Sequence, residues 1–305
     1  MTKKIILIAG PTASGKSKLA ILLAKKINGE ILNADSMQVY KEFSILSSRP
    51  QKKHLKEVNH HLYGFTSAQK HFSTGIWLKK VKKKVEECLK KRKVPIIVGG
   101  TGLYFNAITK GISQIPKIDI KTRKKIRSLY KKIGAKKFYE KLITLDPKAK
   151  NKILLTDTQR VLRVYEVKYK TKKSLYEWAS NTKSQFLRYD IKKIFLNVPR
   201  NTLLVKIEKR TEKMFNNGCI KEIEKFRKKK IDKSLPANKL IGFKEISDHL
   251  DGLTLLDQAK ELINIKTRQY AKRQYTWSRG HMGNWKKLYS EDSSSLLKKV
   301  LKVIS

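Results

Sequence analysis

The chain has 305 residues, of which 40% are hydrophobic, and this length suffices for a sizeable core and about two domains. Its longest apolar stretches, such as residues 5–9 and 94–98, are of strand length, so we expect no membrane span and a cytoplasmic protein. The formal net charge of +46, from 71 basic and 25 acidic residues, predicts an anionic partner, for which nucleic acid is the leading candidate, although AT-biased codon usage also produces a lysine excess.

The first hundred residues alternate between strand and helix patterns. Residues 5–9, 30–34 and 94–98 are apolar runs of strand length, and residues 18–27 and 77–92 have helical periodicity. Strands that alternate with helices are typical of a parallel sheet.

The pattern changes after Gly111, and Pro116 marks a boundary. Helical segments are predicted at about 119–132, 135–145 and 156–170, a further strand at 191–198, and helices from 200 to about 285. We therefore predict an α/β fold: a P-loop parallel-sheet core begun by residues 1–112, a helical insertion at 113–190, and completion of the core with C-terminal helices at 191–305.

Eight residues after the first strand fit the phosphate-binding pattern G-x-x-x-x-G-K-[ST]. They are Gly10, Pro11, Thr12, Ala13, Ser14, Gly15, Lys16 and Ser17. The glycines let backbone N–H groups converge on an anion, Lys16 adds a positive charge, and Ser17 offers a hydroxyl to Mg²⁺. A di- or triphosphate is the expected ligand, against the alternative of a chance match.

Two further loops follow predicted strands. Asp35 stands where open parallel sheets expose catalytic groups, so it is a candidate base or indirect Mg²⁺ ligand, with a helix N-cap before Ser36 as the alternative. Residues 99–105, GGTGLYF, offer no carboxylate of the kind that hydrolytic nucleotide enzymes use to hold Mg²⁺. The Thr101 hydroxyl and nearby N–H groups are suited to steering a substrate, or Thr101 simply caps a helix.

Arginine is scarce, at 13 residues, so its clusters are informative. Arg160 and Arg163 share a helical face, with Arg123 and Arg127 upstream; these form either an RNA-binding surface or a solvated face. Near the C-terminus, residues 268–279 interleave arginines with Tyr270, Tyr275 and Trp277, which either stack on bases or form core.

Cysteine and histidine give no metal-binding pattern. Cys88 and Cys219 lack C-x-x-C spacing or a histidine pair nearby, so we expect them to be buried apolar residues. His60 and His61 lack a third ligand at recognisable spacing and are expected to pack or hydrogen-bond near the sheet.

Seven segments, in order along nearly the whole chain, carry a resemblance. They are GPTASGKS at 10–17, DSMQVY at 35–40, HHL at 60–62, GGTGLYF at 99–105, QRVLR at 159–163, IGFKE at 241–245 and RQYAKRQYTW at 268–277. Together they resemble the bacterial tRNA dimethylallyltransferase family. The P-loop alone is weak evidence, but DSMQVY with GGTGLYF and RQYAKRQ is highly specific.

The resemblance implies transfer of a dimethylallyl group from dimethylallyl diphosphate to the exocyclic amine of the adenosine immediately 3′ of the anticodon, with release of diphosphate and help from Mg²⁺. It implies that the insertion and basic C-terminal segments grip the tRNA anticodon stem-loop, and we expect a monomer. By motif position, Asp35 corresponds to the general base, and Thr101 and Arg210 to groups near the departing diphosphate. The family's tRNA contacts correspond to Asp35, Ser36, Met37, Gln38, Thr101, Arg123, Gln159, Arg160, Val161, Leu162, Arg163, Leu240, Ile241, Gly242, Phe243, Lys244 and Glu245.

Three positions depart from the family pattern. Arg49 replaces a lysine, Lys206 replaces an arginine, and Ser278 replaces an aromatic residue. The first two keep the charge, whereas Ser278 puts a packing role at that site in doubt.

Two other functions remain open from the residues. One is a P-loop kinase or ATPase acting on nucleotides or RNA, in which Asp35 activates a phosphate acceptor. The other is a basic RNA-binding protein with a vestigial loop.

Overall fold

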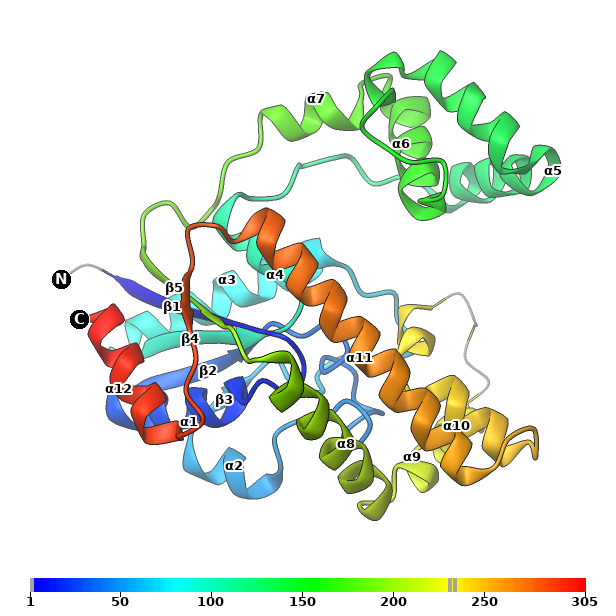
Figure 1. Ribbon diagram of the computed structural model, residues 1–305. Coiled ribbons are helices and arrows are strands. Elements are labelled where there is room, and N and C mark those ends of the chain that lie inside the picture. The colour runs from blue at the N-terminus through cyan, green and yellow to red at the C-terminus, as the bar shows by residue number, and fades with distance from the viewer. Residues whose placement is uncertain (1–2, 230–231, 233–234) are drawn as a thin grey trace. The chain divides into compact units, whose positions relative to one another are not determined.

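In the computed structural model, which describes residues 3–229, 232 and 235–305, six strands form one parallel sheet in the order β3-β2-β4-β1-β5-β6 (Figure 1). The predicted α/β class is confirmed, and all four predicted strands are present: β1 (Lys4–Ala9), β2 (Gly29–Asn33), β4 (Val94–Gly99) and β5 (Asp190–Leu196). The edge strands β3 (His60–His61) and β6 (Lys286–Leu288) escaped prediction because they are very short and polar.

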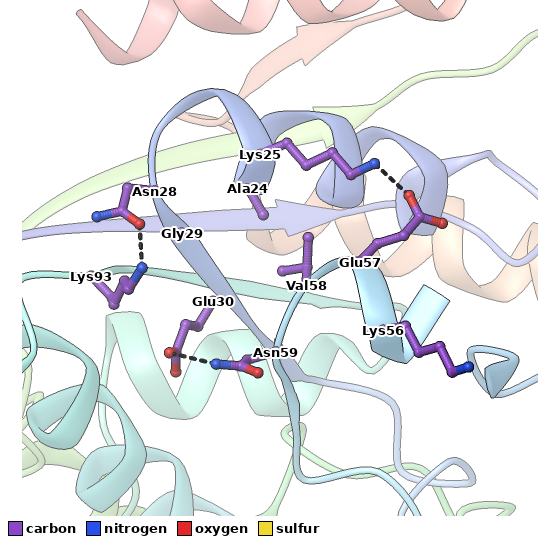
Figure 2. Close-up of a pocket in the computed structure, with 10 residues that line it drawn as sticks. All are labelled: Ala24, Lys25, Asn28, Gly29, Glu30, Lys56, Glu57, Val58, Asn59 and Lys93. Atoms are coloured by element: carbon purple, nitrogen blue, oxygen red, sulfur yellow. Dashed lines mark hydrogen bonds and ion pairs between the residues drawn. The ribbon is translucent and has the colours of Figure 1, made fainter. Parts of the chain in front are cut away.

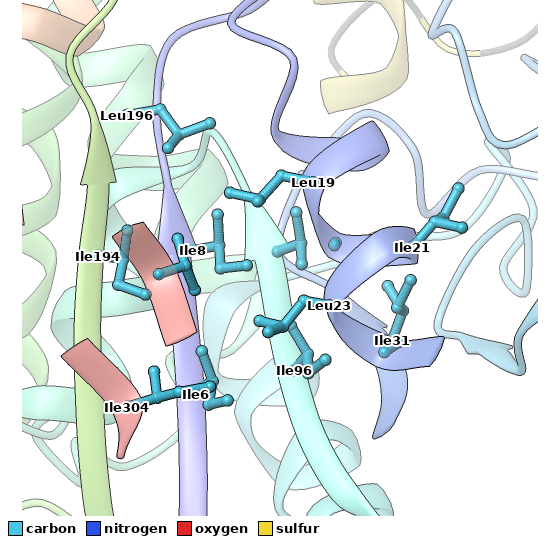
Figure 3. Close-up of a cluster of buried hydrophobic side chains, with 14 of the residues drawn as sticks. Ile6, Ile8, Leu19, Ile21, Leu23, Ile31, Ile96, Ile194, Leu196 and Ile304 are labelled. Carbon is cyan, nitrogen blue, oxygen red and sulfur yellow. The ribbon is translucent and has the colours of Figure 1, made fainter. Parts of the chain in front are cut away.

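The sheet core is a layer of β-branched and leucine side chains. Ile6 and Ile8 on β1 lie in register with Ile96 on β4 and Ile194 on β5. Figure 3 shows these side chains packed with those of α1 (Lys16–Lys26), including Leu19, and of α12 (Ser293–Ile304), a helix that was not predicted from the sequence. Burial on both faces fixes the strands, and thereby the loops that follow their carboxyl ends.

Seven further α-helices of the described residues belong to the part of the chain that contains the sheet. They are α2 (Lys52–Glu57), α3 (Thr74–Lys90), α4 (Gly102–Thr109), α8 (Arg200–Asn216), α9 (Cys219–Arg227), α10 (Phe243–Leu250) and α11 (Leu256–His281). Helix α3 begins three residues before the predicted start because the Ser73 hydroxyl accepts the Ile76 N–H as an N-cap.

Residue contacts divide the chain into two compact units, residues 1–109 with 186–305, and residues 110–185. The smaller unit consists of α5 (Ile120–Leu145), α6 (Thr158–Thr171) and α7 (Leu175–Ser180), the last of which was not predicted. Gly134, with φ of 77°, breaks α5 where the sequence predicts two helices, and Phe138 and Val164 are fully buried in a separate core. Among the described helices, none has the length and apolar content that crossing a membrane requires.

Candidate functional site

The P-loop, residues 10–17, connects β1 to α1. Ala13 and Gly15 have positive φ, at 59° and 83°, which turns successive N–H groups toward one side. Helix α1 has neither a side-chain cap nor an acidic residue in its first turn, so its positive end is open to an anion. The Lys16 ammonium donates to the Pro11 carbonyl at 2.8 Å, and the buried Ser14 hydroxyl has no hydrogen-bond partner among the described residues. This geometry is that of a phosphate-binding loop.

Two cations and one carboxylate share this edge of the sheet. Burial lowers the pKa of Lys16 to about 8, with the Asp35 charge raising it and Arg210 lowering it further. Burial likewise lowers the pKa of the Arg210 guanidinium, against the charge of Asp35. Arg210 also donates to the Thr12 hydroxyl, which brings its positive charge to the P-loop. The predicted catalytic residues Asp35 and Arg210 are therefore neighbours of Lys16.

Asp35 is held in a turn rather than at a helix end. Its backbone N–H donates to Asn33 Oδ1 at 2.8 Å, and its own Oδ1 accepts the Met37 N–H at 2.9 Å. No helix follows at residues 36–39, so the N-cap alternative is wrong. The second carboxylate oxygen makes no hydrogen bond among the described residues, which leaves it available to a substrate proton.

Thr101 connects the loop after β4 to the loop after β2. Its hydroxyl accepts the Ser36 N–H at 2.9 Å and donates to Ser36 Oγ at 3.3 Å. Although α4 begins at the next residue, the hydroxyl does not cap it, so the helix-cap alternative is wrong. Thr101 therefore fixes the loop that carries Asp35.

The glycines of the GGTG sequence are required by close packing. A Cβ on Gly99 would lie 2.1 Å from the Ala34 carbonyl oxygen, and a Cβ on Gly100 would lie 2.3 Å from Gln274 Nε2. On Gly102 it would lie 2.3 Å from the Trp277 ring. These glycines thus let Ala34, directly after β2, and the side chains of α11 lie against the backbone of residues 99–102.

Gln274 is a site residue that was not predicted from the sequence. Its Oε1 accepts the Thr12 N–H and its Nε2 donates to the Gly100 carbonyl, both at 2.8 Å. It therefore joins the P-loop to the loop after β4. In the segment RQYAKRQ, the arginines and aromatic residues indicated a function. Gln274 is neither charged nor aromatic, so the sequence did not mark it as a site residue.

A largely apolar pocket of about 300 Å³ opens beside these loops. It is lined by Ala9, Gly10, Gly100, Thr101, Gly102, Leu103, Phe105, Phe195, Tyr270, Arg273, Gln274, Trp277, Ser278 and Met282.

Burial, with the Asp35 charge, raises the pKa of Tyr63, Tyr104 and Tyr270 above the usual range, so these phenols remain neutral. The site combines an anion cradle, a carboxylate and an apolar cavity.

The C-terminal aromatics have packing roles. Tyr275 donates its hydroxyl hydrogen to the Val198 carbonyl and packs on Phe195, and Trp277 lines the apolar pocket. Ser278 is buried and donates to the Tyr275 carbonyl at 2.8 Å, so its hydroxyl is satisfied. Tyr270, Tyr275 and Trp277 are all half-buried, so they lie at the margin of the core and not within it.

The structure also places the other two departures, Arg49 and Lys206. Arg49 donates to the Lys41 carbonyl at 3.2 Å, and Lys206 is a half-buried residue on α8. Gln38 donates its amide to the Ser47 and Ser48 carbonyls at 2.9 and 3.1 Å, which holds the segment that carries Arg49.

Residues 240–245 form a helix start. Gly242 has φ of 98° and precedes α10, and the buried Glu245 carboxylate accepts the Gly242 N–H at 2.8 Å and pairs with Lys266. Leu240 is buried, Ile241 and Phe243 are half-buried, and the exposed Lys244 pairs with Asp248. The Glu245 carboxylate thus has a structural role.

In the smaller unit, some of the predicted RNA-contacting residues are exposed and others are buried. Gln159 and Arg160 are exposed on α6, where Arg160 pairs with Asp157 at 3.5 Å, whereas Val161 is buried in the core and Leu162 is half-buried. Arg123 and Arg163 converge on the buried carboxylate of Glu166.

His60 and His61 hydrogen-bond at the sheet edge, as predicted. His61 Nε2 lies 2.6 Å from the buried carboxylate of Glu30, which also accepts from Asn59 and from the Cys88 thiol. The ligand-type atoms of Glu30, His61 and Cys88 lie within 4.8 Å of one another, a grouping that sequence spacing did not reveal. The hydrogen bonds account for the burial of Glu30 without a bound ion.

Figure 2 shows the polar pocket beside Glu30, with a volume of about 270 Å³. Ion pairs and hydrogen bonds on its walls join Lys25 to Glu57 and Lys93 to Asn28. It lies at the amino end of β2, whereas Asp35 follows the carboxyl end, so it is not part of the P-loop site.

Comparison with known proteins identifies the family. The family model described as IPP transferase matches residues 38–281. The tRNA dimethylallyltransferase of Pelagibacter ubique is 52% identical over 98% of this chain and 96% of that protein, and the one of Rickettsia massiliae is 42% identical over 99% and 84%.

Solved structures of similar fold also come from tRNA isopentenyl- and dimethylallyltransferases. The crystal structure of the full-length tRNA isopentenylpyrophosphate transferase from Bacillus halodurans superposes with a TM-score of 0.70 at 29% identity, over 99% of this chain and 97% of that chain. A eukaryotic dimethylallyltransferase, captured acting on tRNA, gives a TM-score of 0.82 at 28% identity, over 94% and 74%. These similarities do not favour the kinase or ATPase alternative, and the chain belongs to the IPP transferase family of tRNA dimethylallyltransferases.

Proposed function

We propose that this protein transfers a dimethylallyl group from dimethylallyl diphosphate to the exocyclic amine of the adenosine immediately 3′ of the anticodon of tRNA. The observation that carries the proposal is the meeting of three features at one edge of the sheet. The P-loop offers N–H groups to a diphosphate, the pocket offers apolar surface to a prenyl chain, and Asp35 stands beside both cations.

In this proposal the P-loop holds the diphosphate as it leaves the allylic carbon. As the allylic carbon–oxygen bond breaks, negative charge develops on the leaving oxygen, and Lys16, Arg210 and the N–H groups at the start of α1 stabilise it. Such preorganised donors contribute about 3–4 kcal/mol each where they have been removed singly.

The residues present also fit Mg²⁺, which prefers oxygen ligands. Ser17 is exposed in the first turn of α1, and the nearby Ser14 hydroxyl is buried and unpartnered within the described part of the chain, so oxygen ligands are available here. Ser17 would hold the ion together with the diphosphate. When bound, Mg²⁺ supplies additional neutralisation of the diphosphate charge.

The apolar pocket would receive the dimethylallyl group. Phe105, Phe195 and Trp277 line it without offering a nucleophile, so water is kept from the allylic carbon while it carries positive charge.

Asp35 would take the proton. The adenine amine forms a bond to the allylic carbon, the bond to diphosphate breaks, and the amine hydrogen moves to the free carboxylate oxygen of Asp35. General bases of this kind contribute about 10²–10⁴-fold. The target base must leave its stack to reach the site.

The smaller unit would bind the anticodon stem-loop. It carries 22 Lys and Arg against 6 Asp and Glu, a difference of 16, and its exposed arginines suit phosphate contacts. We expect the enzyme to act as a monomer in the cytoplasm.

The test is a transfer assay with the purified protein, Mg²⁺ and dimethylallyl diphosphate. A tRNA transcript with adenosine 3′ of the anticodon is compared with one carrying guanosine there, and nucleoside mass spectrometry detects the product. We expect prenyladenosine from the first transcript alone. Hydrolysis of ATP without prenyl transfer, in a parallel reaction, would overturn the proposal.

A further inference from the structure

Three arginines of the smaller unit surround one buried carboxylate. Arg123 Nε lies 3.7 Å from Glu166 Oε2, Arg127 Nε lies 3.9 Å from Oε1, and Arg163 Nη1 lies 3.9 Å from Oε2. We call Arg123, Arg127 and Arg163 the arginine cluster. The Glu166 side chain is only 5% exposed, whereas the arginine side chains are 33%, 58% and 38% exposed.

The arginine cluster comes from two helices that pack on each other. Arg123 and Arg127 are one turn apart on α5, and Arg163 and Glu166 are one turn apart on α6. Helices α5 and α6 pack closely and enclose the core of this unit. The carboxylate therefore lies where it can attract guanidinium groups from both helices at once.

The guanidinium groups are attracted to the carboxylate but keep free donors. At 3.7–3.9 Å they lie beyond ordinary hydrogen-bond distance of the carboxylate. Arg123 Nε is buried and finds no hydrogen-bond partner in residues 3–229, 232 and 235–305. Within the described part of the chain, no side-chain hydrogen bond of these three arginines is present. Three positive charges and one negative charge leave a local excess of two, with unused donors of the planar geometry that matches phosphate.

We propose that Glu166 is a positioning residue that holds the arginine cluster ready for RNA phosphates. The inference deepens the proposed function, on which it rests for the identity of the RNA as tRNA. Without the carboxylate, the three like charges repel one another and the exposed side chains spread into solvent. Binding must then order these side chains anew and weakens, even though the protein has become more positive.

The positioning role and a simple net-charge effect predict opposite changes in the tRNA affinity of a Glu166 variant. Glu166→Gln keeps the shape and removes one negative charge, and Glu140→Gln removes one from an exposed position on α5. If only net charge matters, both variants bind tRNA slightly more tightly. If Glu166 positions the cluster, Glu166→Gln binds about tenfold more weakly and Glu140→Gln does not.

Fluorescence anisotropy with labelled tRNA, from about 50 to 200 mM salt, measures both affinity and salt slope. We expect the slope of Glu166→Gln to fall by about 0.7–0.9 for each phosphate that is no longer neutralised, while transfer at saturating tRNA stays within about twofold. Binding of Glu166→Gln as tight as the wild type would overturn the proposal.

A second pair applies if Glu166→Gln fails to fold. Arg127→Gln and Lys131→Gln each remove one exposed charge from α5, one turn apart, and thermal melting checks both. A larger loss of affinity for Arg127→Gln supports the arginine cluster, and equal losses overturn it. Wild-type protein that binds tRNA but transfers no prenyl group would refute the proposed function and leave this inference standing.

Discussion

Replacement of Asp35 by asparagine removes the proposed general base but keeps the hydrogen bonds that hold the turn. The Asp35 Oδ1 atom accepts the Met37 N–H, and an asparagine Oδ1 can accept the same bond. The backbone bonds between Asp35 and Asn33 do not involve the carboxylate. The turn should therefore survive, and tRNA affinity should remain within a few-fold.

The expected loss of rate follows from the missing base. A general base contributes about 10²–10⁴-fold, which corresponds to about 2.7–5.4 kcal/mol of activation free energy. A second effect runs through Lys16. The Asp35 charge raises the pKa of Lys16, so in the variant that pKa falls further below its present value of about 8. Measured at about pH 6.5, Lys16 stays largely protonated, and the rate reports mainly on the base.

Single-turnover quench experiments with saturating tRNA and dimethylallyl diphosphate measure this step directly. Asp35→Ala is the companion variant, because alanine loses the bond to Met37 as well as the base. We expect Asp35→Ala to weaken tRNA binding beyond the effect of Asp35→Asn. A rate for Asp35→Asn within about threefold of the wild type would remove Asp35 from the base role.

Three other predictions concern the same edge of the sheet. Lys16 loses its positive charge as pH rises through about 8, so kcat/KM for dimethylallyl diphosphate should fall above that pH. Lys16→Arg should shift this decline to higher pH, and a flat wild-type profile to about pH 9.5 would contradict the prediction. Gln274→Glu turns a donor toward the Gly100 carbonyl into a carboxylate beside an anion site, so diphosphate affinity measured by calorimetry should fall at least about tenfold, while Gln274→Ala falls less. Gly102→Ala places a methyl group against the Trp277 ring and should lower the melting temperature by several degrees, and restoration by Trp277→Leu would confirm that the clash is the cause.

The sequence predicted the elements that carry strong local signals. The strands β1, β2, β4 and β5 are apolar runs between helices, and the helix break at Gly134 follows from a glycine between two periodic segments. The two edge strands, with the sequences HH and KKL, exist because neighbouring backbone offers hydrogen bonds, which no local pattern records.

Site residues divide in a similar way. Motif spacing indicated Lys16 and Asp35, because P-loops and carboxyl-edge acids have a fixed relation to strands. The role of Gln274 depends on α11 returning to two loops more than 170 residues earlier in the sequence. The carboxylate of Glu166 gave no sequence signal either, since a single acidic residue among many lysines gains meaning only from three-dimensional convergence.

The strand order bears on how the protein is made. β4 lies between β1 and β2, so the P-loop and Asp35 emerge early from the ribosome but gain their common neighbour only after residue 99. β5 follows the insertion, and Gln274 arrives near the end of the chain. A nascent chain released before α11 would expose the uncovered apolar wall of the pocket beside its P-loop. Premature termination should therefore yield an aggregation-prone fragment rather than a weakly active enzyme.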